Sequence, residues 1–156
     1  MKRLLVITAA LLAILPVLAQ APQGIVMWKA ADLKAYASTL APKINDQKLA
    51  TQALADFGGY NTLMVYREAS GEAEYHETAA DFTIIEAGEG ELILGGTIKG
   101  GHSTGQGEIR GTSIDGGRSY PVAPGDVINI PAKTPHQMTV RSGQKITYMV
   151  VKVTGR

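Results

Sequence analysis

From Tyr60 onward, the chain alternates short apolar runs with breaks rich in glycine, proline or polar residues. Short runs that favour Val, Ile, Thr and Tyr are typical of β-strands, and Gly-containing breaks between them are typical of tight turns. Because no long helical pattern separates the runs, the sequence predicts an antiparallel barrel or sandwich. The expected strands are Thr62 to Arg67, Ala73 to His76, Phe82 to Glu86, Glu91 to Leu94, Ser119 to Val122, Asp126 to Ile130, His136 to Val140, and Ile146 to Val153.

The glycine-rich stretch from Gly95 to Gly117 fits two interpretations. A strand around Glu108 to Gly111 is one of them, and a mobile loop over the mouth of the barrel is the other.

Residues 20–59 have a different composition, rich in Ala, Leu and Lys. Apolar side chains recur at helical spacing, which predicts a short helical segment packed on a barrel formed by residues 60–156. We expect Pro42 to end the first helix and Gly58-Gly59 to end the helical region. The apolar positions are Leu33, Ala37, Leu40, Leu49, Ala53 and Phe57.

The first residues match the pattern of a secretory signal peptide. Met1-Lys2-Arg3 is basic, Leu4 to Leu18 is almost wholly apolar, and Ala19 supplies a small residue for cleavage. We therefore expect a signal peptide at residues 1–19, cleavage after Ala19, and a periplasmic or secreted protein without a membrane anchor. A retained anchor is the alternative, although the apolar run is short for a bilayer of about 30 Å.

Charge and cysteine content exclude several function classes. Without Lys2 and Arg3, the formal charge falls from +1 to −1, so the composition predicts no nucleic-acid partner. The sequence has no Cys, which excludes disulfides, thiolate metal sites and cysteine nucleophiles.

Four residues form a candidate metal site. Glu74 and His76 are two residues apart, so a strand places both side chains on one face. Asp81 begins the following strand and His136 begins a strand much later in the chain. Two imidazoles and two carboxylates suit a divalent first-row metal. Taken singly, each residue also fits an ordinary surface or hydrogen-bonded role.

The same segments resemble the two signature motifs of the cupin superfamily, which are small metal-binding jelly-roll barrels. The first motif runs His-x-His, three or four residues, Glu, six residues and Gly. The sequence has Glu74-Tyr75-His76, then Asp81, then Gly88, with matching spacing. The second motif runs Gly, five residues, Pro-x-Gly, two residues and His. The run from Gly125 to His136 matches it except that Lys133 replaces the second Gly.

This resemblance implies an all-β, cupin-type antiparallel jelly-roll barrel with a short N-terminal helical segment. It implies that His76, Asp81 and His136 bind one divalent transition metal, which is Fe, Mn, Ni, Cu or Zn. Glu74 stands where the motif has its first His, so it is either a fourth metal ligand or, if unliganded, a general base. A cupin that has lost its metal and keeps the pocket is the alternative.

Three functions remain open from the sequence. The first is a metal-dependent enzyme of the oxygenase, isomerase or lyase type, acting on a small molecule. The second is a barrel that binds a small ligand without chemistry, and the third is a barrel that forms a homodimer. The chain also resembles a group of exported bacterial cupins, which supports the fold and the site but implies no substrate.

Overall fold

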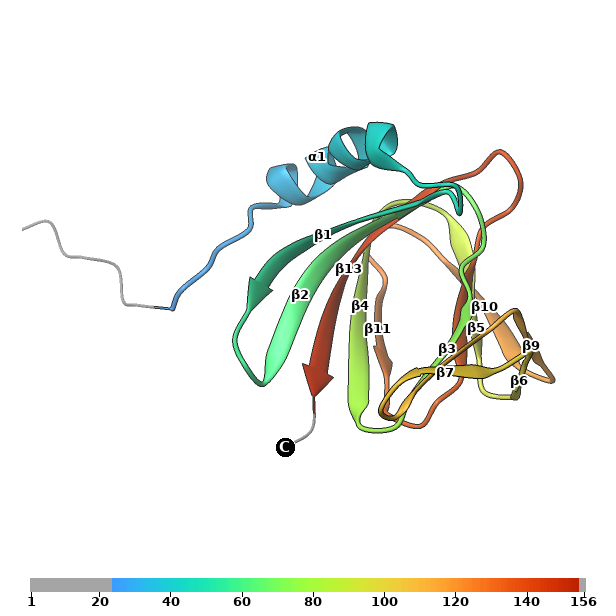
Figure 1. Cartoon of the computed structure of the whole chain (residues 1–156). Helices are drawn as coiled ribbons and strands as arrows, with labels where there is room; N and C mark the ends of the chain where they lie inside the picture. The colour runs from blue at the N-terminus through green and yellow to red at the C-terminus, as the bar shows by residue number, and fades with distance from the viewer. Residues whose placement is uncertain (1–23, 155–156) are drawn as a thin grey trace, which may run out of the picture.

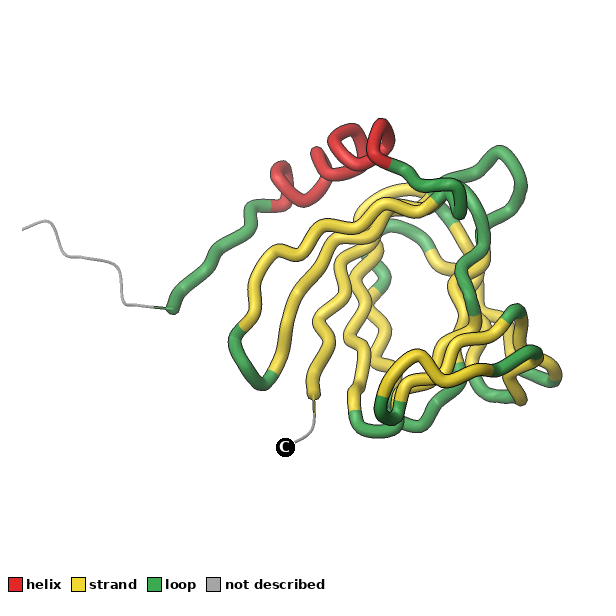
Figure 2. The backbone as a smooth tube through the Cα atoms, viewed as in Figure 1, coloured by secondary structure: helices red, strands yellow, loops and turns green. Residues whose placement is uncertain are grey.

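The computed structural model describes residues 24–154, so the predicted signal peptide at residues 1–19 lies outside the described residues. Two curved sheets face each other around a common interior (Figure 1, Figure 2). The first sheet has the order β1 (Leu49–Asp56), β2 (Tyr60–Arg67), β13 (Ile146–Thr154), β4 (Ala79–Gly88) and β11 (Val127–Ile130). The second has the order β10 (Arg118–Val122), β5 (Gly90–Leu94), β12 (His136–Thr139), β3 (Ala73–His76), β8 (Glu108–Gly111) and β7 (His102–Gly105).

All strand pairs within these sheets are antiparallel, as predicted for an all-β jelly-roll barrel. The eight strands expected from the sequence are present, with ends that differ by up to three residues. Between Gly95 and Gly117, the chain forms strands in place of the loop that was the second interpretation. They are β7 and β8 of the second sheet and a two-stranded ribbon of β6 (Thr97–Lys99) and β9 (Ser113–Asp115).

The apolar core lies between the two sheets. Side chains that alternate along each strand meet there, because successive residues of a strand point to opposite faces. Val65, Ile85, Leu92, Ile146 and Val150 are buried members of this cluster. Burying a side chain of this size contributes roughly 1.5–3 kcal/mol. This packing holds the strands that carry the polar residues described below.

A single described helix, α1 (Ala30–Leu40), covers the outer face of the first sheet (Figure 1). Leu40 is fully buried against Met64, Tyr66 and Met149, which point outward from β2 and β13. A short 3₁₀ turn, Ala41–Lys43, follows at Pro42, consistent with the predicted end of the first helix. No helix within residues 24–154 has the length and apolar character needed to span a membrane.

The prediction that residues 20–59 are helical throughout is wrong in its second half. Residues 49–56 form β1, which pairs with β2 along its length, and Gly58-Gly59 lies in the turn between these two strands. The Leu49, Ala53 and Phe57 spacing suits a helix, but pairing with β2 overrides this weak local preference. Gly58 has φ 80°, a left-handed conformation that suits glycine in a hairpin turn.

Candidate metal centre

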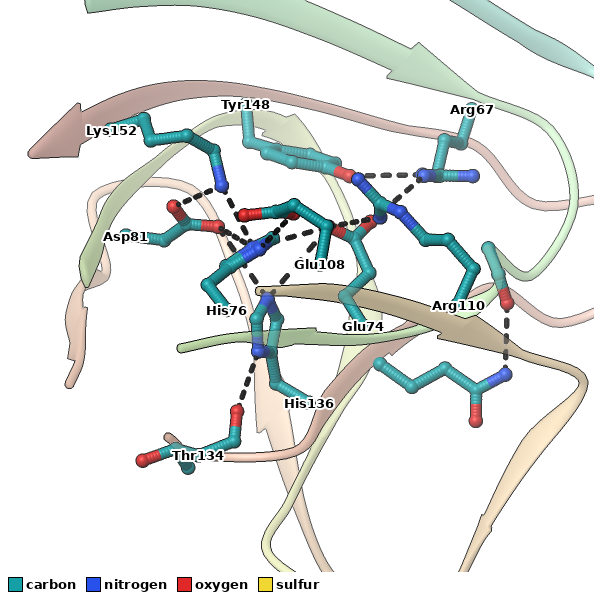
Figure 3. Close-up of polar contacts among 12 residues, drawn as sticks. Arg67, Glu74, His76, Asp81, Glu108, Arg110, Thr134, His136, Tyr148 and Lys152 are labelled. Atoms are coloured by element: carbon teal, nitrogen blue, oxygen red, sulfur yellow. Dashed lines mark hydrogen bonds and ion pairs between the residues drawn. The ribbon is translucent and has the colours of Figure 1, made fainter. Parts of the chain in front are cut away.

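The four predicted ligands come together from strands of both sheets (Figure 3). Glu74 and His76 lie on β3, Asp81 on β4 and His136 on β12. Their side chains meet because the strands bring them opposite one another: His136 pairs with Glu74 in the β12–β3 ladder. Residues directly opposite on antiparallel strands share a face and lie within contact distance.

The ligand atoms of these four residues all lie within 4.8 Å of one another. Nε2 of His76 is 3.3 Å from Oδ2 of Asp81 and 3.6 Å from Oε2 of Glu74. Nε2 of His136 is 3.5 Å from the same Asp81 oxygen and 3.9 Å from the same Glu74 oxygen. Two ring nitrogens and two carboxylate oxygens therefore surround one point.

Hydrogen bonds at Nδ1 fix the orientation of both imidazole rings. Nδ1 of His76 lies 2.5 Å from Oε2 of Glu108, and Nδ1 of His136 lies 2.9 Å from the carbonyl oxygen of Thr134. Each Nδ1–H donates to its oxygen, so Nε2, the nitrogen that would bind a metal, faces the centre. Metal-binding histidines are held in this way by an outer carboxylate or carbonyl.

The two carboxyl groups are held ionised by their surroundings. Burial raises the pKa of Glu74, but His76, Arg110 and His136 lower it by more than burial raises it, so that the pKa is about 2. Burial also raises the pKa of Asp81, whereas His136, His76 and Lys152 together hold it well below its usual range. Both groups are thus anions that can bind a cation at neutral pH.

Lys152, on β13, places its ammonium group beside the centre. Nζ is 2.8 Å from Nε2 of His76 and 3.0 Å from Oδ1 of Asp81. Burial and Lys152 lower the pKa of His76, but Asp81 and Glu74 raise it to about 9. In the absence of a metal, the two carboxylates therefore favour the protonated form of His76.

The residues present fit a divalent metal by two observations. Within residues 24–154, Oδ1 of Asp81 is a buried oxygen without a well-aligned hydrogen bond, despite its closeness to Lys152. A set of two carboxylates and two imidazoles, each imidazole oriented through Nδ1, matches what first-row divalent ions bind. Atoms bound to one ion at about 2.1 Å lie at most about 4.2 Å apart, so the four groups need only a small inward shift.

The centre opens on a cavity of about 830 Å³ inside the barrel. Glu74, Asp81 and His136 form part of its wall, with Lys152 above them. The wall also includes Arg67 and Arg110, which both approach Glu74: Arg110 forms an ion pair with Oε2, and Nη2 of Arg67 is 3.9 Å from Oε1. A volume of this size matches pockets that enclose small molecules.

Several polar residues of this centre were not found by sequence reasoning. Glu108, Arg110, Arg67 and Lys152 all contact it, but each lies on a strand outside the two motifs. One faint signal existed, because Glu108 and Arg110 are two apart and face His76 and Glu74 across the β3–β8 ladder. Recognising it required knowing that residues 108–111 form a strand beside β3.

The backbone has a left-handed conformation at two positions of the motifs, Gly88 and Lys133. Gly88 has φ 77°, and a Cβ there would lie 2.0 Å from the carbonyl oxygen of Lys145. Lys133, which replaces the motif's Gly, has φ 66°. Its amide donates to the carbonyl oxygen of His76 at 2.7 Å, so the turn before His136 is fastened to β3 despite a conformation that costs roughly 1–2 kcal/mol.

Comparison with solved structures identifies the architecture. A cupin-2 domain protein from Rhodospirillum rubrum aligns over 70% of this chain and 62% of its own, with 17% identity and a TM-score of 0.51. The chain has the cupin fold. A protein from Thermus thermophilus aligns over 75% of this chain and 92% of its own, with 17% identity and a TM-score of 0.55.

The cupin fold by itself says little about function. Peruvianin-I, a cysteine peptidase from Thevetia peruviana latex, aligns over 89% of this chain and 77% of its own, with 14% identity and a TM-score of 0.52. This chain has no Cys to act in that way. The chain also spans only 62% of the length of the cupin-2 neighbours from Rhodopseudomonas palustris and Rhodospirillum rubrum. No protein-family model and no curated protein matches it.

Proposed function

We propose that this protein is an exported, metal-dependent enzyme of small-molecule metabolism. The observation that carries the proposal is the convergence of Glu74, His76, Asp81 and His136, with both Nε2 atoms directed at the centre. Four protein ligands leave open positions on a six-coordinate ion, where a small molecule from the cavity can bind. A metal bound there supplies Lewis-acid polarisation of an oxygen atom of the substrate.

The surroundings of Glu74 favour a role as a ligand over a role as a general base. A pKa of about 2 makes its carboxylate a weak base at neutral pH, since efficient bases have a pKa near the working pH. Its ion pair with Arg110 also holds Oε2 beside the two histidines. Glu74 then contributes a negative charge that holds the metal. Any proton transfer in the reaction needs another group.

Lys152 is suited to that task. It is the one amine among the described residues of the cavity wall, and its Nζ lies within contact distance of two metal ligands. Nε2 of His76 and the carboxylate of Asp81 would hold the metal, and the ammonium group of Lys152 would then be free to face the cavity. An ammonium group that donates a proton next to a Lewis acid favours isomerase or lyase chemistry over oxygenase chemistry.

The test is the metal content of the wild-type protein, prepared without a His tag from the periplasm or medium where the N-terminal sequence predicts it. A His76→Ala/His136→Ala variant is prepared in parallel, and His102→Ala, in the exposed β7, is the matched control. We expect about one equivalent of Fe, Mn, Ni, Cu or Zn in the wild type and in His102→Ala, and none in the double variant. A folded wild-type protein that takes up none of these ions when they are added would refute the proposal.

A further inference from the structure

Arg67 is a buried cation with unused hydrogen-bond donors. It is 9% exposed, and its Nε donates to the hydroxyl oxygen of Tyr148 at 2.9 Å. Its Nη2 is 3.9 Å from Glu74, beyond hydrogen-bond distance, and neither Nη atom has a hydrogen bond among residues 24–154. Burying a guanidinium costs several kcal/mol unless its donors are paired. Neither Nη atom is among the fully buried atoms without a partner, so both reach the space of the cavity, where an acceptor from outside the described residues can bind them.

The fold makes specific room for this side chain. A Cβ at Gly71 would lie 2.6–2.8 Å from the guanidinium atoms Cζ, Nη1 and Nη2 of Arg67. Gly71 also lines the cavity, so the guanidinium end of Arg67 lies at the cavity wall and not in the apolar core. The hydroxyl proton of Tyr148 has no acceptor among the described residues and lies in the same place (Figure 3).

Charges on the cavity wall indicate the sign of the missing group. Its described residues include three cations, Arg67, Arg110 and Lys152, and three anions, Glu72, Glu74 and Asp81. These six charges of the wall sum to zero. A divalent ion at the centre adds two positive charges, which a bound anion would offset.

The rest of the wall indicates the body of the ligand. Tyr148 is the one Tyr, Phe or Trp among the described lining residues, which leaves little surface on which a sugar ring could stack. Apolar side chains also line the cavity: Leu49, Leu63, Val65, Leu92, Met138 and Val150.

We infer that the cavity binds a small aliphatic carboxylic acid whose carboxylate is held by Nη1 and Nη2 of Arg67 and the hydroxyl of Tyr148. A guanidinium matches a carboxylate in two parallel hydrogen bonds, which a point charge cannot do. This inference deepens the proposed function and rests on it, because the metal supplies the positive charge that the carboxylate offsets.

The test is calorimetric titration with straight-chain carboxylates from propanoate to octanoate, each paired with its primary amide, and with butyl phosphate. We expect at least one carboxylate to bind about tenfold or more tightly than its amide, since hydrogen bonds to charged groups are the stronger ones. Arg67→Met should abolish that preference, whereas Arg141→Met, which removes an exposed arginine paired with Glu91, should keep it. Because Arg67 is buried, Tyr148→Phe is a second test that keeps the ring, and it should weaken carboxylate binding severalfold.

Equal binding of every carboxylate and its amide, or a preference that survives in both Arg67→Met and Tyr148→Phe, would overturn the inference. Tighter binding of butyl phosphate than of any carboxylate would overturn the ligand class. Metal content is measured on the same samples. A metal-loaded protein without carboxylate preference rejects this inference alone, whereas a carboxylate preference in a protein that takes up no metal rejects the proposed function and leaves the Arg67 site in place.

Discussion

Replacing Lys152 with Met should raise the affinity for the metal and lower the stability of the metal-free protein. The ammonium group is 2.8 Å from Nε2 of His76 and 3.0 Å from Oδ1 of Asp81, so a metal must displace it from both ligands. Methionine keeps the length and most of the volume of the side chain but carries no charge. The variant therefore removes the competing cation and little else.

The magnitude follows from the geometry. Two unit charges 3.0 Å apart attract by about 5 kcal/mol at an effective dielectric constant of about 20. Lys152 is only 23% exposed and Asp81 8%, so water recovers part of this attraction and not all of it when the pair separates. We expect displacement to cost about 1.4–3 kcal/mol, which corresponds to a metal affinity about tenfold to a hundredfold higher in Lys152→Met.

The metal-free variant should lose about 1–3 kcal/mol of stability, because Oδ1 of Asp81 loses the cation beside it while Oδ2 keeps the two histidines. Metal affinity is measured by competition with a chelator of known affinity, and stability by urea unfolding in EDTA. Lys99→Met is the matched control, since Lys99 forms a 3.0 Å ion pair with Asp115 in which both side chains are more than half exposed. This control should change stability by less than about 1 kcal/mol and leave metal affinity unaltered. A Lys152→Met variant with unchanged or weaker metal affinity would refute the idea that the lysine competes with the metal.

Three further results are expected. Glu108→Gln should weaken metal binding about tenfold or more, because the carboxylate that orients His76 through Nδ1 becomes neutral; wild-type affinity by chelator competition would contradict this role. The metal-free protein should be most stable below pH 6.5 and lose up to about 3 kcal/mol as pH rises to about 9, because the pKa of His76 is raised from 6.5 to about 9 and the folded state gains stability from its protonated form. Urea midpoints at pH 6 and pH 9 in EDTA measure this loss, which should vanish when metal occupies Nε2, and a flat profile in EDTA would count against it. Gly88→Ala should destabilise the fold by about 1–3 kcal/mol or more, because its Cβ would lie 2.0 Å from the backbone carbonyl oxygen of Lys145, whereas Gly59→Ala, with open space around it, should be close to neutral in thermal unfolding.

The strands and the four central residues could be predicted because their signals are local. Glu74 and His76 share a strand face by their spacing, and the motif spacings to Asp81 and His136 indicated that the four belong together. The structure brings these side chains within 4.8 Å of one another. Such spacings can be recognised in the sequence without knowing which strands are neighbours.

The parts that could not be predicted depend on which strands are neighbours. Leu49 to Asp56 carries a helical spacing, yet forms an edge strand because β2 offers it a complete ladder. Lys152 and Arg67 stand in strands whose sequence gives no sign that they face a metal centre. Their role follows from the position of β13 between β2 and β4, and strand order is a long-range property.

The contacts of the metal centre form only when two strand ladders have the correct register. The pairs His76–Glu108 and Asp81–Lys152 are each formed by residues directly opposite on adjacent strands, in the β3–β8 and β4–β13 ladders. A slip of one residue in either ladder would turn one member of the pair to the opposite face. Such a misfolded chain could keep most of its backbone hydrogen bonds, but it would lose a side chain that orients or neutralises a metal ligand. Metal retention would then distinguish correctly assembled molecules from compact ones with a shifted strand, and a metal supplied during folding would trap the correct register selectively.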